Sequence, residues 1–349
     1  MTFATGLGTV LSLELRQRVR GRAWYILLGV FAILVAVVTA ALTFALVGLS
    51  GDSDPDAGSG VLSTIIYFVL LLGTLVTPAL SGNAINGDRA DGTLATTQVT
   101  QITTGQLVLG KFLASWITAL AFLAVSVPFL LFSVALGGVR LDTALVSIVV
   151  LGFELGVVAA IGVGLSGMLQ RPLFSIVVTY LVVAALSIGT LIAFTLGGLV
   201  IQSTVTSTNR DFAYVDEDGT EVCSEPMTYT YSTPRFDYFW GALVANPYVV
   251  LADAVPTSFD RNGYPDDLFG YIKLGVRQTQ IAPDLSPEFD ACSYVPIASP
   301  VPKEVIDSTV PSWFVGALIQ LVLGAAALAL GWRATRTPAG RLAAGSRIA

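Results

Sequence analysis

Histidine is absent from this sequence, and charged residues are scarce. Of 349 residues none is histidine, 12% are charged and two are cysteine. Without histidine the chain cannot form an H-E-x-x-H zinc site or a Ser-His-Asp triad, which excludes two common classes of enzyme. Soluble domains carry about 25% charged residues, so a chain this poor in charge is expected in a membrane if its apolar residues form long runs.

Six such runs are present. They predict helices at about 23–48, 61–82, 106–136, 143–168, 173–200 and 311–332. Each run can supply the roughly 20 apolar residues that a membrane-spanning helix needs. The first run is too long for a cleavable signal peptide and lacks a small-residue cleavage site. The expected fold is an all-α polytopic membrane protein with six transmembrane helices.

The distribution of arginine predicts the topology. The N-terminal segment 1–22 contains four arginines, and four more follow from Arg333 onward, whereas the short loops on the other side carry mainly aspartate. Positively charged segments stay in the cytoplasm, so both termini are predicted to be cytoplasmic. The net charge of −6 conceals this asymmetry and does not indicate nucleic-acid binding. The 15 arginines against 3 lysines are typical of a GC-rich bacterial genome, so we expect a bacterial plasma membrane.

Between the fifth and sixth helices lies a polar segment, 201–310, that is too long and too aromatic for a plain linker. It predicts a small folded extracytoplasmic domain. Cys223 and Cys292 both fall in it, and two cysteines on the oxidising side of a membrane are expected to form a disulfide. The acidic stretch Asp260–Asp267 lacks the spacing of a calcium loop, so no metal site is predicted there.

Within this domain the stretch Phe239–Val255 is apolar enough to resemble a seventh span. Asn246, Pro247 and Asp253 argue against a crossing. We predict an interfacial helix resting on the outer leaflet, with its aromatic residues at headgroup level.

The segment from Gly105 to Lys111 fits the start of a phosphate-binding loop, G-x-x-x-x-G-K. Phe112 stands where that loop needs Ser or Thr, and no strand precedes the segment. Instead Thr103 and Gln106 predict a capping box that starts the third span, with Lys111 snorkelling to the membrane surface. The chain is therefore not expected to hydrolyse ATP.

Small residues in the fourth span predict close helix packing. Gly162–Gly167 matches a dinucleotide-binding pattern but lies inside the span, as does the pair Gly152 and Gly156. Glu154 lies about halfway along the same span, where an acid by default suggests function. Two interpretations stay open: a role in the substrate pathway, or a carboxyl group bonded to a neighbouring helix.

The stretch GDRADGTLATTQVTQITTGQLVLGK resembles the cytoplasmic signature of ABC-2-type permeases, the membrane subunits of ATP-binding-cassette exporters. The matching positions are Asp88, Arg89, Asp91, Gly92, Thr93, Leu94, Gly110 and Lys111. The family usually has glutamate at the two aspartate positions and a proline near Gln101. LSLELRQRVRGRAWYIL resembles the interfacial helix that precedes the family's first span, and NPYVVLADAV resembles an element ahead of its last.

The resemblance implies a permease dimer that forms the substrate pathway and docks on separate ATPase subunits. The loop at 83–105 would couple the two, through Asp88, Arg89, Asp91, Gly92, Thr93 and Leu94. This chain would bind no cofactor and catalyse no reaction, because ATP and Mg would be bound by the ATPase. The expected cargo is a hydrophobic or amphipathic molecule such as a lipid, a drug or a peptide. The alternatives are a secondary transporter, a membrane-anchored sensor whose outer domain binds a ligand, or an ordinary charged turn at 83–105.

The predicted organisation is an N-terminal interfacial helix at 1–22; transmembrane helices one to five at 23–200, with the coupling loop at 83–105; the disulfide-bonded domain at 201–310, with an interfacial helix near 239–255; the sixth helix at 311–333; and a cytoplasmic tail at 334–349.

Overall fold

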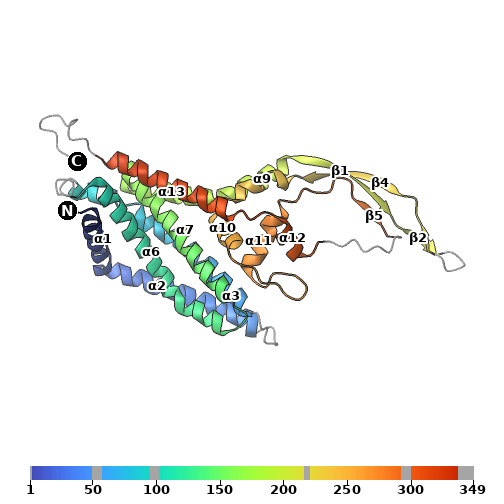
Figure 1. Cartoon of the computed structure of the whole chain (residues 1–349), viewed down its shortest axis with the longest axis horizontal. Coiled ribbons are helices and arrows are strands. Elements are labelled where there is room, and N and C mark those ends of the chain that lie inside the picture. Colours follow the sequence, from blue (N-terminus) through green and yellow to red (C-terminus); the bar gives the residue numbers. More distant parts are fainter. Residues whose placement is uncertain (1, 49–56, 95–101, 216–220, 292–299, 337–349) are drawn as a thin grey trace.

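The computed structural model describes residues 2–48, 57–94, 102–215, 221–291 and 300–336 (Figure 1). Within these ranges six helices are long and apolar enough to cross a membrane, which confirms the predicted number. They are Arg22–Leu46, Ala57–Ala90, Thr104–Ala135, Leu141–Met168, Pro172–Val200 and Trp313–Thr335. Six apolar helices of this length indicate a multi-pass membrane protein.

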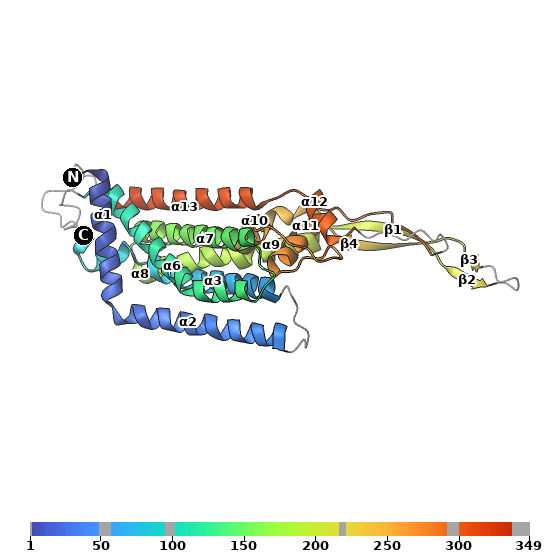
Figure 2. The ribbon, with the colours of Figure 1, turned by 60° about the horizontal axis from the view of Figure 1, so that its bottom comes forward.

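The spans form one bundle, with a short helix lying across one end. The elements are α1 (Phe3–Arg20), α2 (Arg22–Thr43) with the π-helix η1 (Phe44–Gly48), α3 (Ala57–Ser81), α4 (Asn86–Ala90), α6 (Thr104–Ala135), α7 (Leu141–Met168), α8 (Pro172–Ala184), the π-helix η2 (Ala185–Gly189), α9 (Thr190–Val200) and α13 (Trp313–Thr335). Figure 2 shows α1 running across the ends of the spans, at the end where α13 finishes. We call this the α1 end. The strands of the 201–310 segment project from the opposite end, which we call the ribbon end.

Local sequence explains several helix boundaries. The predicted capping box is confirmed: the Thr103 hydroxyl accepts from the Gln106 N–H, and the Gln106 side chain accepts from the Thr103 N–H. The Gln106 amide also donates to the carbonyl of Phe3 at 3.1 Å, which ties the start of α1 to the start of α6. Gly21 adopts an extended conformation between α1 and α2, so the chain can turn there from the bundle's end into the first span.

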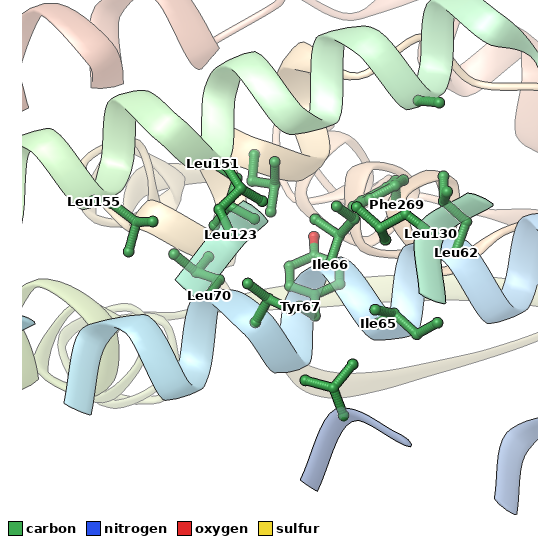
Figure 3. Close-up of a cluster of buried hydrophobic side chains, with 14 of the residues drawn as sticks. Leu62, Ile65, Ile66, Tyr67, Leu70, Leu123, Leu130, Leu151, Leu155 and Phe269 are labelled. Atoms are coloured by element: carbon green, nitrogen blue, oxygen red, sulfur yellow. The ribbon is translucent and has the colours of Figure 1, made fainter. Parts of the chain in front are cut away.

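The main core lies between α3, α6 and α7. Figure 3 shows Leu62, Ile66 and Leu70 of α3 in one buried cluster with Leu123 of α6 and Leu151 of α7. Full burial of such a side chain stabilises the fold by about 1.5–3 kcal/mol. The same cluster includes residues from the 201–310 segment, so this core extends beyond the spans.

Helices α7 and α13 approach closely because glycine lies at their contact. A Cβ atom on Gly164 would fall 2.3 Å from the backbone of Ala327, and one on Gly167 would fall 2.9 Å from Gly331. Those distances are too short for real Cβ contacts, so the contact requires glycine. The predicted packing role of the glycine-rich stretch in the fourth span is confirmed.

The 201–310 segment contains a projecting ribbon and a helical part that packs on the bundle. Its elements are β1 (Gln202–Arg210), β2 (Phe212–Val215), β3 (Glu221–Cys223), β4 (Met227–Pro234), η3 (Phe236–Tyr238), η4 (Trp240–Leu243), α10 (Pro247–Ala254), α11 (Leu268–Gln278), β5 (Glu288–Asp290) and α12 (Pro302–Ser308). Strand β1 pairs antiparallel with β4 and parallel with β5, while β2 and β3 form a second sheet. The ribbon extends away from the bundle in both views (Figures 1 and 2).

The prediction of an interfacial helix at Phe239–Val255 is wrong. The stretch forms the 3-10 turn η4 and the eight-residue helix α10, most of which is buried. Leu251 and Ala252 are fully buried in the main core, together with Phe269 of α11. The apolar character of the stretch therefore serves the interior of the protein, where α10 packs on α7, α11 and α13.

Asp253 links α10 to the last span. Its carboxylate, 0% exposed, pairs with the Arg277 guanidinium at 2.8 Å. It also accepts hydrogen bonds from the backbone N–H groups of Ser312 and Trp313 at 2.6 and 2.9 Å. Those N–H groups lie at the start of α13 and have no partner within the helix. The carboxylate satisfies them, and its negative charge interacts favourably with the positive end of the helix dipole.

Replacing Asp253 by alanine should lower the free energy of unfolding by about 3–5 kcal/mol, because Arg277 would stay buried without its partner. Thermal unfolding of the purified protein measures this. The matched control is Asp307→Ala, which removes an exposed pair with Lys303 and should cost less than about 1 kcal/mol. Equal effects from the two substitutions would contradict the assignment.

Candidate coupling surface

The predicted coupling residues lie on α4 and the turn after it, at the α1 end. The start of α4 is fixed by α7, because the Ser166 hydroxyl accepts from the N–H groups of Ile85 and Asn86 at 3.0 and 3.1 Å. Ser166 is fully buried. The loop after the second span is thus attached to the fourth span by direct hydrogen bonds.

Arg89 points inward. Its guanidinium donates to the carbonyl of Leu169 at 3.1 Å and to the Asn86 side chain at 2.7 Å. Leu169 follows the last residue of α7, where carbonyls lack helical partners. The Arg89 side chain therefore caps the end of α7 and holds α4 against it. The guanidinium group, predicted to contact another protein, makes these bonds within the chain.

The prediction that Lys111 snorkels to the membrane surface is wrong. Its side chain is 2% exposed and pairs with both Glu14 of α1 and Asp88 of α4, with 2.7 Å between Lys111 Nζ and Asp88 Oδ2. Lys111 can be buried because α1 covers the start of α6 and supplies a carboxylate. Three helices that are distant in the sequence meet at this ammonium group. We call Glu14, Asp88 and Lys111 the charge cluster.

Glu14 and Arg18 belong to the candidate site, and the sequence analysis did not predict either of them. The buried face of α1 runs through Gly6, Val10 and Glu14, at four-residue spacing. Arg18 continues it, and its guanidinium donates to the Leu80 carbonyl at 3.2 Å. Burial lowers the pKa of Arg18, and the Glu14 carboxylate opposes that shift. The available signal was a lone acid on this inward face of an arginine-rich helix.

The exposed part of the loop is its tip. Asp91, Gly92 and Thr93 are exposed, and Gly92 has φ +72°, a conformation that glycine adopts without strain. Leu94 turns back into the protein and is buried beside Val10 in a small apolar cluster. Residues 95–101 of the predicted loop lie outside the described residues. Thus Asp91–Thr93 lies at the surface, while Leu94 anchors the turn.

Glu154 is buried between α7 and α13. The Gln320 side chain on α13 interacts with its carboxyl group and donates to the Ala245 carbonyl at 3.1 Å. One carboxyl oxygen of Glu154 has no hydrogen-bond partner among the described residues. This arrangement favours the contact with a neighbouring helix over a place in a substrate pathway.

Only one of the two cysteines lies among the described residues. Cys223 ends β3 and pairs with Phe212 in the β2–β3 sheet, whereas Cys292 lies outside the described residues. The predicted disulfide therefore stays a prediction. Among the residues that the structure does describe, no group of three His, Cys, Asp or Glu side chains is arranged to hold a metal ion.

Comparison with known proteins leaves the family open. No family model matches the chain, and no curated protein is significantly similar to it.

The charge cluster should be a structural unit. Lys111→Met would leave the carboxylates of Glu14 and Asp88 without their cation, at a cost of about 3 kcal/mol. The expected results are a lower unfolding temperature and faster proteolysis of α1. Adding Glu14→Gln and Asp88→Asn to Lys111→Met should restore part of the loss.

The matched control is Arg16→Gln on the exposed side of α1, which should change stability by no more than about 0.5 kcal/mol. A Lys111→Met protein as stable as this control would show that the cluster contributes nothing.

Proposed function

We propose that this chain is the permease subunit of an ATP-driven exporter of the ABC-2 type. In this proposal it forms a dimer with a second permease subunit, and separate ATPase subunits bind ATP and Mg and dock at the α1 end. The chain itself is not an enzyme. Six spans, an amphipathic helix ahead of the first span and a charged loop after the second support it.

One observation carries the proposal. The tip Asp91–Thr93 is exposed, while the helix just before it is bonded to two other helices, α6 and α7. Ser166 and the end of α7 hold α4 on one side, and Lys111 of α6 holds it on the other. Any displacement of the tip by a soluble partner would therefore move the second, third and fourth spans together. An ordinary surface turn needs none of these attachments.

The proposal also carries the orientation and the location. With the α1 end in the cytoplasm, exposed Arg16 and Arg20 lie on the side that the positive-inside rule requires. The 201–310 segment is then extracytoplasmic, and the membrane is the bacterial plasma membrane. The cargo in this proposal is a hydrophobic or amphipathic molecule.

Charge reversal at the exposed tip tests the coupling role. Asp91→Arg should leave folding unchanged, because the side chain is exposed, but should abolish co-purification of an ATPase or its stimulation by substrate. The control is Glu225→Arg, an equal charge reversal on the ribbon, which should have no effect. Normal ATPase binding and transport by Asp91→Arg would reduce the loop to a surface turn. Absence of any ATPase partner for the unmodified chain would favour a secondary transporter or a sensor.

The disulfide belongs to the same proposal, since it needs the ribbon to lie in an oxidising compartment. Two contacts support it: Cys223 lies opposite Phe212, and the N–H of Ala291, the residue before Cys292, donates to the Arg210 carbonyl at 2.9 Å. Cys223 and Ala291 therefore both meet the chain near residues 210–212.

Mass spectrometry of the unreduced protein should find a peptide linking Cys223 to Cys292 within one chain. Cys223→Ser should destabilise the ribbon by up to about 4 kcal/mol while Lys111-dependent stability at the other end stays unchanged. Free thiols at both positions in the native protein would refute the pairing.

A further inference from the structure

A cavity of about 580 Å³ lies between the second and fifth spans, toward the ribbon end. Its walls come from α3 on one side and from α8, η2 and α9 on the other, and α10 and α11 close it at the ribbon end. Leu71, Leu75, Ile188 and Leu191 line it and are themselves exposed. Because these four residues belong to membrane spans, the mouth opens sideways toward lipid.

The cavity lies beside a π-helical segment of the fifth span. The π-helix η2 separates α8 from α9, and such segments occur frequently at functional sites. Asn246, 1% exposed, holds this segment in place. Its amide donates to the Ser187 carbonyl at 2.7 Å and to the Thr190 hydroxyl at 2.8 Å. Its side-chain oxygen accepts from the Tyr248 N–H and so starts α10. One buried side chain thus fixes both the wall and the end of the cavity.

The hydroxyl groups of Tyr180 and Thr74 donate within the protein. The Tyr180 hydroxyl donates to the Leu75 carbonyl at 2.5 Å, and the Thr74 hydroxyl donates to the Leu71 carbonyl at 2.8 Å. The side chain of Tyr248 interacts with that of Thr74. Each hydroxyl oxygen keeps acceptor capacity, since a hydroxyl has two lone pairs.

A proline interrupts the backbone hydrogen bonding of the α3 wall. Pro78 lies inside α3 and has no N–H, so it cannot bond the carbonyl of Thr74, four residues earlier, and Thr74 lines the cavity. The cavity therefore offers several acceptors, and its lining side chains contain no charged group. Burying an ion there would carry the full penalty of an unpaired charge.

We propose that this cavity binds an uncharged amphiphile from the membrane, with an apolar tail and a head that donates hydrogen bonds, such as a hydroxyl or an amide. The tail lies along Leu71, Val183 and Leu191, and the head meets Thr74, Tyr180 and Tyr248. The inference rests on the proposed function, because the bound molecule would be the exporter's cargo. It deepens that function by selecting a neutral head over an acidic or a cationic one.

Photolabelling tests the site on the full chain in lipid nanodiscs, with no ATPase present. The probe is a twelve-carbon alcohol that carries a diazirine on its tail. Labelled peptides should map to residues 71–75 and 180–191. The unlabelled alcohol should compete at least about tenfold better than the carboxylate or the ammonium compound of the same length. Equal competition by either ion would overturn the inference.

Two adjacent residues provide matched variants. Ala184 lines the cavity, whereas Ala185 is exposed and does not. Ala184→Phe should reduce labelling about tenfold, and Ala185→Phe should leave it unchanged. Equal labelling of both variants would show adsorption to the protein surface only.

Tyr180→Phe keeps the shape of the cavity and removes one acceptor, so it guards against misfolding of the larger variant. It should reduce the preference for the alcohol over an alkane of equal length while tail labelling persists. An unchanged preference would contradict the assigned head position. Because binding is measured without an ATPase, its failure is distinguishable from a failure of ATPase co-purification, which tests the exporter itself.

Discussion

Every place where a membrane helix of this protein ends or changes pitch leaves backbone groups that need a partner. Water supplies those partners in a soluble protein, but hydrocarbon cannot, and each unsatisfied group costs several kcal/mol. Here side chains that are distant in the sequence supply them. Arg89 meets the end of α7, Arg18 meets the last turn of α3, Asn246 meets the π-helix η2, and Asp253 meets the start of α13.

These contacts set which parts of the bundle can move together. At the α1 end, Ser166, Arg89 and Lys111 join α4 to the third and fourth spans. At the ribbon end, Asp253 and Arg277 join α10 and α11 to the sixth. The fifth span is attached differently, because the neutral carboxamide of Asn246 holds its π-helix η2 and much of the surface of the span is exposed. A neutral hydrogen bond is easier to exchange than a buried ion pair, so the wall of the cavity is the more adaptable part.

Sequence reasoning recovered what hydropathy and local spacing encode. The six spans, the capping box at Thr103 and the glycine contacts of α7 all depend on nearby residues or on composition. The charge cluster could not be recovered, because Glu14 and Lys111 are 97 residues apart and nothing local records their meeting. The spacing around Lys111 predicts that it has lipid headgroups as neighbours, but α1 occupies that place. The prediction for the α10 stretch is wrong for a similar reason. Apolar content shows that a segment is buried, but not whether lipid or protein surrounds it.

The side chains that bond the helix ends and η2 are charged only where a buried charge has a partner. The ionic ones, Arg18, Arg89 and Asp253, lie where spans end, and each engages a helix terminus or a carboxylate that offsets the lost hydration. Ser166 and Asn246 need no such compensation, and Asn246 stands beside the cavity, where a charge would lack a partner. Glu154 departs from this rule, since its neighbour is the amide of Gln320 and not a cation. A carboxyl group tolerated between α7 and α13 depends on that amide staying in contact, so separating these two helices would leave Glu154 buried without it.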